Sequence, residues 1–391
     1  MPLVNAKCTN CGANLEVDNT KDADICSSCG SAFIVAKAIN NYLLSENSSN
    51  ATQSSAVQND DTSDFVIFEG VLLDYNGNKR EVVIPSGVKE IGVAAFKGKA
   101  FFTSIVLPDS VTSIVNSAFW GCTGLKNIVI PDGITSIGYH AFRGCTGLTS
   151  IVIPDSVTNI GNSAFSGCTG LTSIVIPNSV TSIGENAFHG CTGLTSIIIS
   201  NSVTDIGVRA FRGCTGLTSI VIPDSVTNIG NSAFSGCTGL TSIVIPDSVT
   251  SIGYSAFNGC TGLTSIVISD RVKSISGGTF SGCAHLKSIE LPNSVKRIGN
   301  GAFEGCTGLT SIMMPNSVTS IDSSAFSGCT SLTSIVIPDS VTWIGREAFR
   351  NCRNLVKVVL PNHTLLDYSA FVYCPNLSSA SREAIINAAK R

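Results

Sequence analysis

Four cysteines near the amino terminus have the residue type and the spacing of a metal site. They form two C-x2-C pairs, Cys8 with Cys11 and Cys26 with Cys29, and fourteen residues separate the pairs. Four thiolates at this spacing suit a tetrahedral zinc ion and leave no open position at which the metal could act in catalysis. We therefore predict one structural zinc ion, with a rubredoxin-like iron site or a thiol redox pair as the alternatives.

The segment that carries these cysteines, residues 1–36, is too short to bury a core unaided, so we expect metal binding to supply its folding energy. It resembles a zinc ribbon, a module that in many proteins binds nucleic acid. The charged residues within 1–37 are Lys7, Glu16, Asp18, Lys21, Asp22, Asp24 and Lys37. Acidic residues outnumber basic ones, and a zinc tetrathiolate adds negative charge, so contacts with phosphate would be poor. We expect this segment to dock on a protein rather than on nucleic acid.

The other twelve cysteines mark an internal repeat. From Cys122 to Cys352 they recur every 23 residues, and Cys374 follows after 22. An Ala-Phe or Thr-Phe pair recurs thirteen times in the same register, from Phe96 to Phe371. The unit reads DSVTNIGNSAFSGCTGLTSIVIP at residues 155–177. So strict a frame predicts a solenoid of about 13 coils, each stacked only on its neighbours.

Within one coil, the apolar residues predict which side chains enter the core. Leu148, Ile151 and Ile153 have the L-x-x-I-x-I spacing of a strand with one buried side, which turns Val152 outward. A second, shorter strand is expected at VTNIG, and the Ala-Phe pair is expected to bring one ring per coil into the core on a helical turn. Stacking at the inter-strand distance of about 4.8 Å gives a rod of roughly 60 Å.

The repeat cysteines form a column with one thiol per coil, not a cluster of ligands. We interpret them as small buried side chains in a tight turn. Neighbouring Cβ atoms about 4.8 Å apart are too distant for an unstrained disulfide, so we predict free thiols. A second column, of Asp or Asn from Asp109 to Asn362, indicates Asx turns, with a row of weak calcium sites as the alternative.

The repeat resembles the BspA-like class of leucine-rich repeats, whose motif AFxxCxxLxxIxLPxxVxxIG is matched over about residues 64–378. The resemblance implies a β-rich leucine-rich-repeat solenoid over residues 64–391, with short strands and helical turns, preceded by the small zinc ribbon. It also implies an N-terminal cap at 64–95, where we expect a hairpin that turns at Asn76-Gly77. Residues 379–391 lack the repeat and predict a capping helix from about Ser381. For residues 37–63 we predict a short helix and then a polar, flexible linker.

Two surfaces of this solenoid are candidates for binding a partner. The first is an outward-facing column on the strands: Val152, Val175, Ile198, Val221, Val244 and Val267. A continuous apolar stripe on a concave face would suit a partner, although β-branched residues also simply suit strands. The second surface flanks each Phe, where the repeats vary most, as at Arg143, His189 and Arg212. By analogy with other leucine-rich repeats, we favour the column on the strands.

Composition narrows the classes of function. The chain has 391 residues, a net charge of −3 and 13% charged residues, so it has no general electrostatic attraction to nucleic acid or an acidic membrane. It contains no run of 18 apolar residues and no visible secretion signal, which predicts a cytoplasmic protein without a membrane span. The histidines, His140, His189, His285 and His363, are far apart. Since no catalytic motif occurs either, we expect no enzyme.

We therefore expect a non-enzymatic scaffold for protein partners, with the zinc ribbon as a second docking module. Exported relatives of the BspA-like class act as surface adhesins. The first alternative is accordingly an adhesin that reaches the cell surface by a non-classical route. The second alternative is a nucleic-acid-associated regulator that acts through the zinc ribbon.

Overall fold

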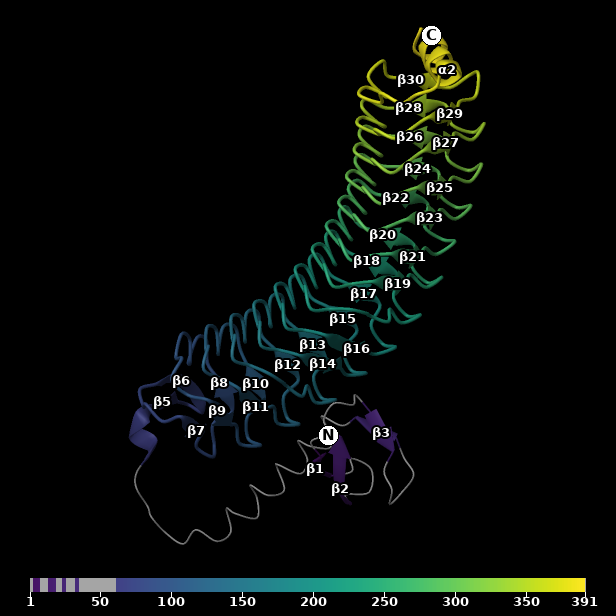
Figure 1. Cartoon of the computed structure of the whole chain (residues 1–391). Coiled ribbons are helices and arrows are strands. Elements are labelled where there is room, and N and C mark those ends of the chain that lie inside the picture. Colours follow the sequence, from purple (N-terminus) through teal and green to yellow (C-terminus); the bar gives the residue numbers. More distant parts are fainter. Residues whose placement is uncertain (1–2, 8–12, 19–22, 26–31, 35–60, 391) are drawn as a thin grey trace.

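The computed structural model describes residues 3–7, 13–18, 23–25, 32–34 and 61–390. Near the amino terminus, β1 (Leu3–Lys7) pairs with β2 (Asn14–Asp18), and β3 (Ala23–Ile25) pairs with β4 (Ala32–Ile34), both antiparallel. The predicted zinc ligands Cys8, Cys11, Cys26 and Cys29 lie outside the described residues, as do the predicted short helix and most of the predicted linker. Residues 61–390 form one long solenoid that ends in a helix (Figure 1).

The core of the solenoid follows the repeat of apolar residues. In one coil, Leu148, Ile151 and Ile153 are buried, and Val157 and Ile160 are buried on the next side of that coil. The Phe of every Ala-Phe or Thr-Phe pair is buried as well. One continuous core therefore runs along the solenoid, as the sequence predicted, because each coil buries its apolar side chains against those of its neighbours.

Most coils contribute a strand to each of two rows of parallel strands that run along the solenoid (Figure 1). We call the row formed by the LTSIVIP segments the strand face, and the row formed by the VTxIG segments the short-strand row. The strand face comprises β7 (Glu81–Val83), β9 (Ser104–Val106), β11 (Asn127–Val129), β14 (Ser173–Ile176), β16 (Ser196–Ile199), β19 (Ser242–Val244), β21 (Ser265–Val267), β23 (Ser288–Glu290), β25 (Ser311–Met313), β27 (Ser334–Val336) and β29 (Lys357–Val359). The short-strand row comprises β8 (Glu90–Ile91), β10 (Ser113–Ile114), β12 (Ser136–Ile137), β13 (Asn159–Ile160), β15 (Ser182–Ile183), β17 (Asp205–Ile206), β18 (Asn228–Ile229), β20 (Ser251–Ile252), β22 (Ser274–Ile275), β24 (Arg297–Ile298), β26 (Ser320–Ile321), β28 (Trp343–Ile344) and β30 (Leu365–Leu366).

The two rows differ in how continuous their hydrogen bonding is. The short-strand row forms sheets of four to six strands, whereas the strand face divides into one three-stranded sheet and four two-stranded sheets. The solenoid bends, and the strand face lies further toward the outer side of the bend than the short-strand row (Figure 1). Coils are further apart on the outer side of a bend, so the hydrogen bonds between their strands are the first to be lost. The prediction that the strand face is concave is therefore wrong.

The segments that carry the Phe residues are turns joined by hydrogen bonds from coil to coil. The N–H of each Phe donates to the carbonyl of the residue before the next Phe, as from Phe165 to Ala187 at 2.9 Å, and this bond recurs at all twelve steps from Phe96 to Phe371. In most coils the residue two before the Phe has a positive φ, for example 57° at Ser163 and 55° at Arg209. A right-handed helical turn does not allow this φ, so the prediction of helical turns is wrong. These bonds keep this side of the solenoid continuous where the strand face divides.

The Phe rings and the cysteines form two regular columns inside the solenoid. Consecutive rings between Phe96 and Phe371 stack with their centroids 4.8 to 5.7 Å apart. Each repeat thiol donates a hydrogen bond to a Phe carbonyl of an earlier coil, as from Cys191 Sγ to Phe165 O at 3.1 Å. All twelve repeat cysteines are buried and unpaired, which confirms the prediction of free thiols. Burial raises the pKa of the Cys191 thiol to about 12, so it stays protonated at neutral pH.

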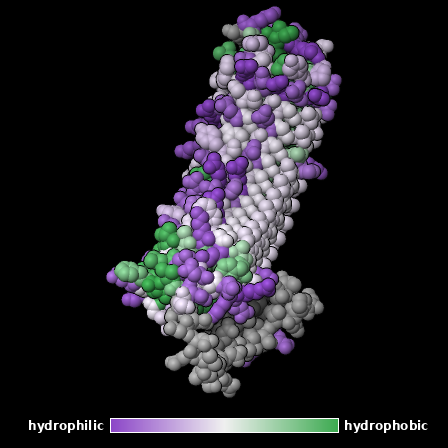
Figure 2. All heavy atoms as spheres, turned by 90° about the vertical axis from the view of Figure 1, so that its left-hand side faces the viewer, coloured by the Kyte–Doolittle hydropathy of each residue, from purple (hydrophilic) through white to green (hydrophobic). Residues whose placement is uncertain are grey.

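The amino-terminal cap is a hairpin that extends the short-strand row. After the 3-10 helix η1 (Asp61–Asp64), β5 (Phe65–Phe68) pairs antiparallel with β6 (Val71–Tyr75), which pairs in parallel with β8. The hairpin turns at Glu69 and Gly70, with φ values of 50° and 80°, so the prediction of a turn at Asn76-Gly77 is wrong. Two successive residues with positive φ are what a two-residue hairpin turn needs. Apolar side chains gather at this end of the solenoid (Figure 2), where Phe68 is exposed.

The carboxyl-terminal cap is the helix α2 (Ser379–Ala389), whose N-cap Ser378 accepts a hydrogen bond from the N–H of Ser381. The buried hydroxyl of Ser381 accepts a hydrogen bond from the N–H of Val358 at 3.0 Å and donates one to Val356 O at 3.2 Å. A further coil would otherwise provide these partners. The helix therefore closes the open end of the solenoid, as terminal caps of repeat proteins do.

Candidate functional site

The column predicted as a partner-binding surface lies on the outside of the strand face. Its members occupy equivalent positions of successive coils, and the strands pair them directly, Val175 with Ile198 and Val244 with Val267. Val152 and Val175 are half-buried. The exposed fractions of the others are 42% at Ile198, 81% at Val221, 62% at Val244 and 59% at Val267. The structure thus brings the six residues together as one apolar stripe whose exposure is greatest at Val221.

The coil that contains Val221 departs from the repeat. Its segment 219–222 reads SIVI, as does the segment that contains β19, yet within this described part of the solenoid it forms neither a strand nor a bridge. The strands on its two sides, β16 and β19, belong to different sheets. Because an identical SIVI segment does form a strand elsewhere, no signal in the local sequence distinguishes this coil. Its departure depends on its position in the bent solenoid.

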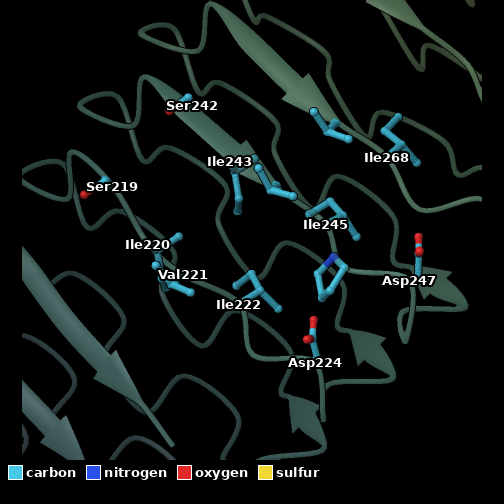
Figure 3. Close-up of a pocket in the computed structure, with 13 residues that line it drawn as sticks. Ser219, Ile220, Val221, Ile222, Asp224, Ser242, Ile243, Ile245, Asp247 and Ile268 are labelled. Atoms are coloured by element: carbon cyan, nitrogen blue, oxygen red, sulfur yellow. The ribbon is translucent and has the colours of Figure 1, made fainter. Parts of the chain in front are cut away.

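A hollow of about 520 Å³ opens on the strand face at this coil (Figure 3). It reaches across three coils, and most of its lining is aliphatic, with Ile220, Ile222, Ile243 and Ile245 among the residues that form it. The carboxylates of Asp224 and Asp247 stand at the end of the hollow away from Ser219 and Ser242 (Figure 3). Such a hollow can take an apolar side chain of a partner, and the two carboxylates favour a basic group beside that side chain.

The lining of the hollow includes no His and no Cys, so it offers no nucleophile with an adjacent base. Across the described residues, no three His, Cys, Asp or Glu side chains come together as a metal site would require. The Asp and Asn column predicted from the sequence contributes at most one carboxylate to each coil, because its position holds either Asp or Asn. No helix in the described part of the chain is long and apolar enough to cross a membrane.

The second predicted surface follows the turns around each Phe, and we call it the turn face. There the structure places Arg143, Arg209 and Arg212 on the outside of the solenoid, with His189 half-buried among them. Burial lowers the pKa of the His189 imidazole, and the guanidinium groups of the three arginines lower it further. Sequence reasoning noticed the variation on this surface. It missed that basic groups from two other coils act on one histidine.

The chain matches the BspA type leucine rich repeat region, in six copies, over residues 74–193, 158–287 and 250–378. These overlapping ranges extend over most of the chain. The protein therefore belongs to the family of BspA-type leucine-rich repeat proteins, as the repeat motif predicted.

Solved structures of related proteins have the same solenoid. A leucine-rich repeat protein from Bacteroides ovatus ATCC 8483 is 32% identical, with a TM-score of 0.67, over 80% of this chain and 93% of that chain. A leucine rich cell surface protein from Faecalibacterium prausnitzii A2-165 is 33% identical, with a TM-score of 0.57, over 84% of this chain and 96% of that chain. A search of curated proteins finds no match.

Proposed function

We propose that this protein is a non-enzymatic scaffold that binds protein partners through its strand face. The observation that carries the proposal is the apolar stripe from Val152 to Val267, which is exposed from Ile198 onward and borders the hollow at Val221. Apolar surface in contact with water costs about 25 cal/mol per Å², and contiguous patches of it mark interaction sites on soluble proteins. Membership of the leucine-rich repeat family supports the same function, since such proteins generally bind proteins.

Two substitutions on the stripe test this function. Val221→Glu combined with Val244→Glu places charge in the stripe without altering the buried side of the coil. The matched control, Thr204→Glu combined with Thr227→Glu, changes the charge equally at exposed positions of the short-strand row. Each full-length variant serves as bait in a lysate of the source cells, and the captured proteins are quantified by mass spectrometry.

We expect the affinity of the valine variant for its specific partners to fall about tenfold, which corresponds to about 1.4 kcal/mol of binding free energy. The threonine variant should capture them like the unmodified protein. Circular dichroism and thermal unfolding establish that both variants are folded. Undiminished capture by the folded valine variant would contradict a partner site on the strand face.

We further propose that residues 1–36 bind one structural zinc ion through Cys8, Cys11, Cys26 and Cys29 and serve as a second docking module. The C-x2-C spacing supports this site. A second support is that residues 8–13 connect β1 to β2 and residues 26–31 connect β3 to β4, so each cysteine pair falls between two paired strands.

Elemental analysis of the purified protein should find one zinc ion per chain. Cys8→Ser combined with Cys26→Ser should release it, whereas the control Cys214→Ser, in the solenoid core, should retain it. Iron in place of zinc, or zinc that persists in the double variant, would contradict the proposed site.

A second candidate function is adhesion at the cell surface. It is favoured by the 33% identity to the Faecalibacterium prausnitzii protein described as a leucine rich cell surface protein. Protease treatment of intact source cells separates the two candidates. Digestion of the solenoid in intact cells would support the adhesin, and protection until lysis would support the cytoplasmic scaffold.

A further inference from the structure

Charge is distributed unevenly along the turn face. In each coil this face begins at the residue after the short strand and ends two residues after the Phe, as at 138–144. Its first six turns, from Gly92 to Gly213, carry the exposed cations Lys97, Arg143, Arg209 and Arg212. Glu185 is the one acidic residue in these six turns. Strongly hydrophilic residues gather along one side of the solenoid beside a pale strip (Figure 2).

The cations of these six turns have no acidic partner in the described part of the chain. Instead, Lys97 Nζ lies 4.3 Å and Arg143 Cζ lies 5.2 Å from the centre of the Trp120 ring. Cation–π contacts of this kind fix the position of a cation while leaving its charge uncompensated. None of the ion pairs among the described residues includes Lys97, Arg143, Arg209 or Arg212.

In later coils of the same solenoid, several arginines do form ion pairs. There, Arg346 and Arg350 both pair with Glu347, at 3.5 and 3.1 Å, and Arg297 pairs with Asp322 at 2.6 Å. The repeat frame is the same in both halves, so the frame does not prevent the arginines from being paired. On the turn face, the described cations outside any ion pair therefore all lie in the first six turns.

The positive charge of the three arginines in the first six turns also acts on His189. Besides burial, the guanidinium groups of Arg212, Arg209 and Arg143 hold the pKa of its imidazole below the usual value. Like charges held together raise the free energy of the unbound protein, and an anion placed among them would relieve that repulsion.

We propose that the first six turns of the turn face bind an acidic segment of a protein partner, in which several Asp or Glu side chains pair with Arg143, Arg209 and Arg212. Arginine suits this role because its planar guanidinium can donate two parallel hydrogen bonds to one carboxylate. The inference rests on the proposed scaffold function and deepens it, because it gives the chemistry of one partner and places that partner on a second surface.

The size of the surface suits a short peptide segment. The six Phe rings beneath it are spaced by 5.2 to 5.5 Å, which makes the six turns about 27 Å long. An extended chain of about eight residues spans that length at about 3.3 Å per residue. At ordinary salt concentrations, charges more than about 10 Å apart are largely screened from each other. The net negative charge of the rest of the protein would therefore repel such a segment only weakly.

Two other polyanions fit less well. Single-stranded nucleic acid binds through several free aromatic faces that stack on successive bases. The six turns expose one such ring, Tyr139, whereas Trp120 is in contact with Lys97 of the coil before and Arg143 of the coil after. A long sulfated polysaccharide would extend past the six turns over a protein whose net charge is −3.

Fluorescence anisotropy with a labelled decaglutamate peptide tests the proposal on the full-length protein. The test variant combines Arg143→Gln, Arg209→Gln and Arg212→Gln. The matched control combines Arg297→Gln, Arg346→Gln and Arg350→Gln, which removes the same charge from the paired arginines. We expect the test variant to bind at least tenfold more weakly and the control to bind within twofold of the unmodified protein. Raising the salt concentration from 50 to 200 mM should weaken peptide binding by the unmodified protein far more than peptide binding by the test variant.

A pH series separates direct binding by these arginines from a purely structural role, because a structural role would not make peptide binding depend on pH. A bound carboxylate should raise the pKa of His189 toward or above its usual value, so binding should strengthen as the pH falls from about 7.5 to 6. The groups that act on His189 are Arg143, Arg209 and Arg212. Burial and the guanidinium group of Arg143 lower the pKa of His140 on the same face as well, so both histidines are expected to take part. His140→Gln combined with His189→Gln should bind the peptide at pH 7.5 but lose this strengthening.

The proposal is overturned if the unmodified protein does not bind decaglutamate, or if the two arginine variants lose binding equally. Tighter binding of a heparin fragment or of oligo-dT than of decaglutamate would overturn the assignment to an acidic protein segment. The variant Val221→Glu with Val244→Glu should bind decaglutamate normally. A failure of this proposal is therefore distinguishable from a failure of the strand-face site.

Discussion

Replacing Phe211 with alanine should separate the solenoid into two parts that unfold independently. Phe211 is fully buried, and its ring stacks on Phe188 at 5.5 Å and on Phe234 at 5.3 Å. A buried Phe→Ala change costs about 3–5 kcal/mol. Each ring pair is worth about 0.5–1.5 kcal/mol beyond burial, and two pairs are lost here. We therefore expect a cost in the upper part of that range, about 4–5 kcal/mol.

Phe371 is the matched control at the end of the same column. Its ring stacks only on Phe349, at 4.8 Å, and its side chain is slightly exposed. Phe371→Ala removes one ring pair instead of two and leaves a space that is partly open to water. We expect it to cost about 1–2 kcal/mol less than Phe211→Ala.

The two tryptophans provide the assay. Trp120 and Trp343 lie in different coils on the two sides of Phe211, so each reports on one half of the solenoid. Urea unfolding is followed by fluorescence in proteins that retain one tryptophan, with the other replaced by Phe. Contacts between neighbouring coils carry the cooperativity of a repeat protein. The two transitions should therefore coincide in the parent protein and separate after Phe211→Ala. Coincident transitions in the Phe211 variant, or a smaller loss there than at Phe371, would refute this reasoning.

Three further predictions concern the turns and the thiols. Gly144 has a φ of 71°, so Gly144→Ala should lower stability by about 1–2 kcal/mol through backbone strain. Gly147→Ala should cost more, because its Cβ would lie 2.4 Å from Thr123 O, and equal thermal midpoints for the two variants would contradict this difference. The twelve repeat thiols should resist a thiol reagent at pH 8 in the native protein and react after denaturation. If mass spectrometry found that the reagent had modified any of the cysteines from Cys122 to Cys374 in the native protein, this burial would be disproved. Burial raises the pKa of Cys191 from 9.0 to about 12, so this thiol loses its proton in the unfolded state at a lower pH than in the folded state. The contribution of this thiol to stability should therefore be constant below pH 9. Above pH 9 it should fall by up to about 1.4 kcal/mol per pH unit. Urea titrations at pH 8 and 10 measure that fall, and Cys191→Ala should reduce it.

Local sequence predicted most of the fold because the repeat is so regular. The L-x-x-I-x-I spacing at Leu148, Ile151 and Ile153 correctly assigned the buried side of the strand. The column of cysteines correctly indicated buried, unpaired thiols. The hairpin turn was misplaced because Asn-Gly is a strong turn signal, whereas the structure turns at Glu69-Gly70, where the register of β5 and β6 requires it.

The candidate site could be predicted only in part. The sequence identified the column from Val152 to Val267 but not the hollow at Val221, because segment 219–222 has a sequence that forms a strand elsewhere in the same chain. It identified the variable positions around each Phe but not the meeting of Arg143, Arg209 and Arg212 around His189. Those residues are up to three repeats apart, and only the stacking of coils brings them together.

The sequence by itself determined the repeat, the buried side of each coil and the family, because these depend on side-chain periodicity within 23 residues. The tertiary structure decided the direction of the bend, the division of the strand face and the position of the hollow. These properties depend on how small differences in spacing between coils add up along the whole solenoid. Hydrogen-bonded turns on one side and interrupted strands on the other set that spacing, and no single repeat contains it.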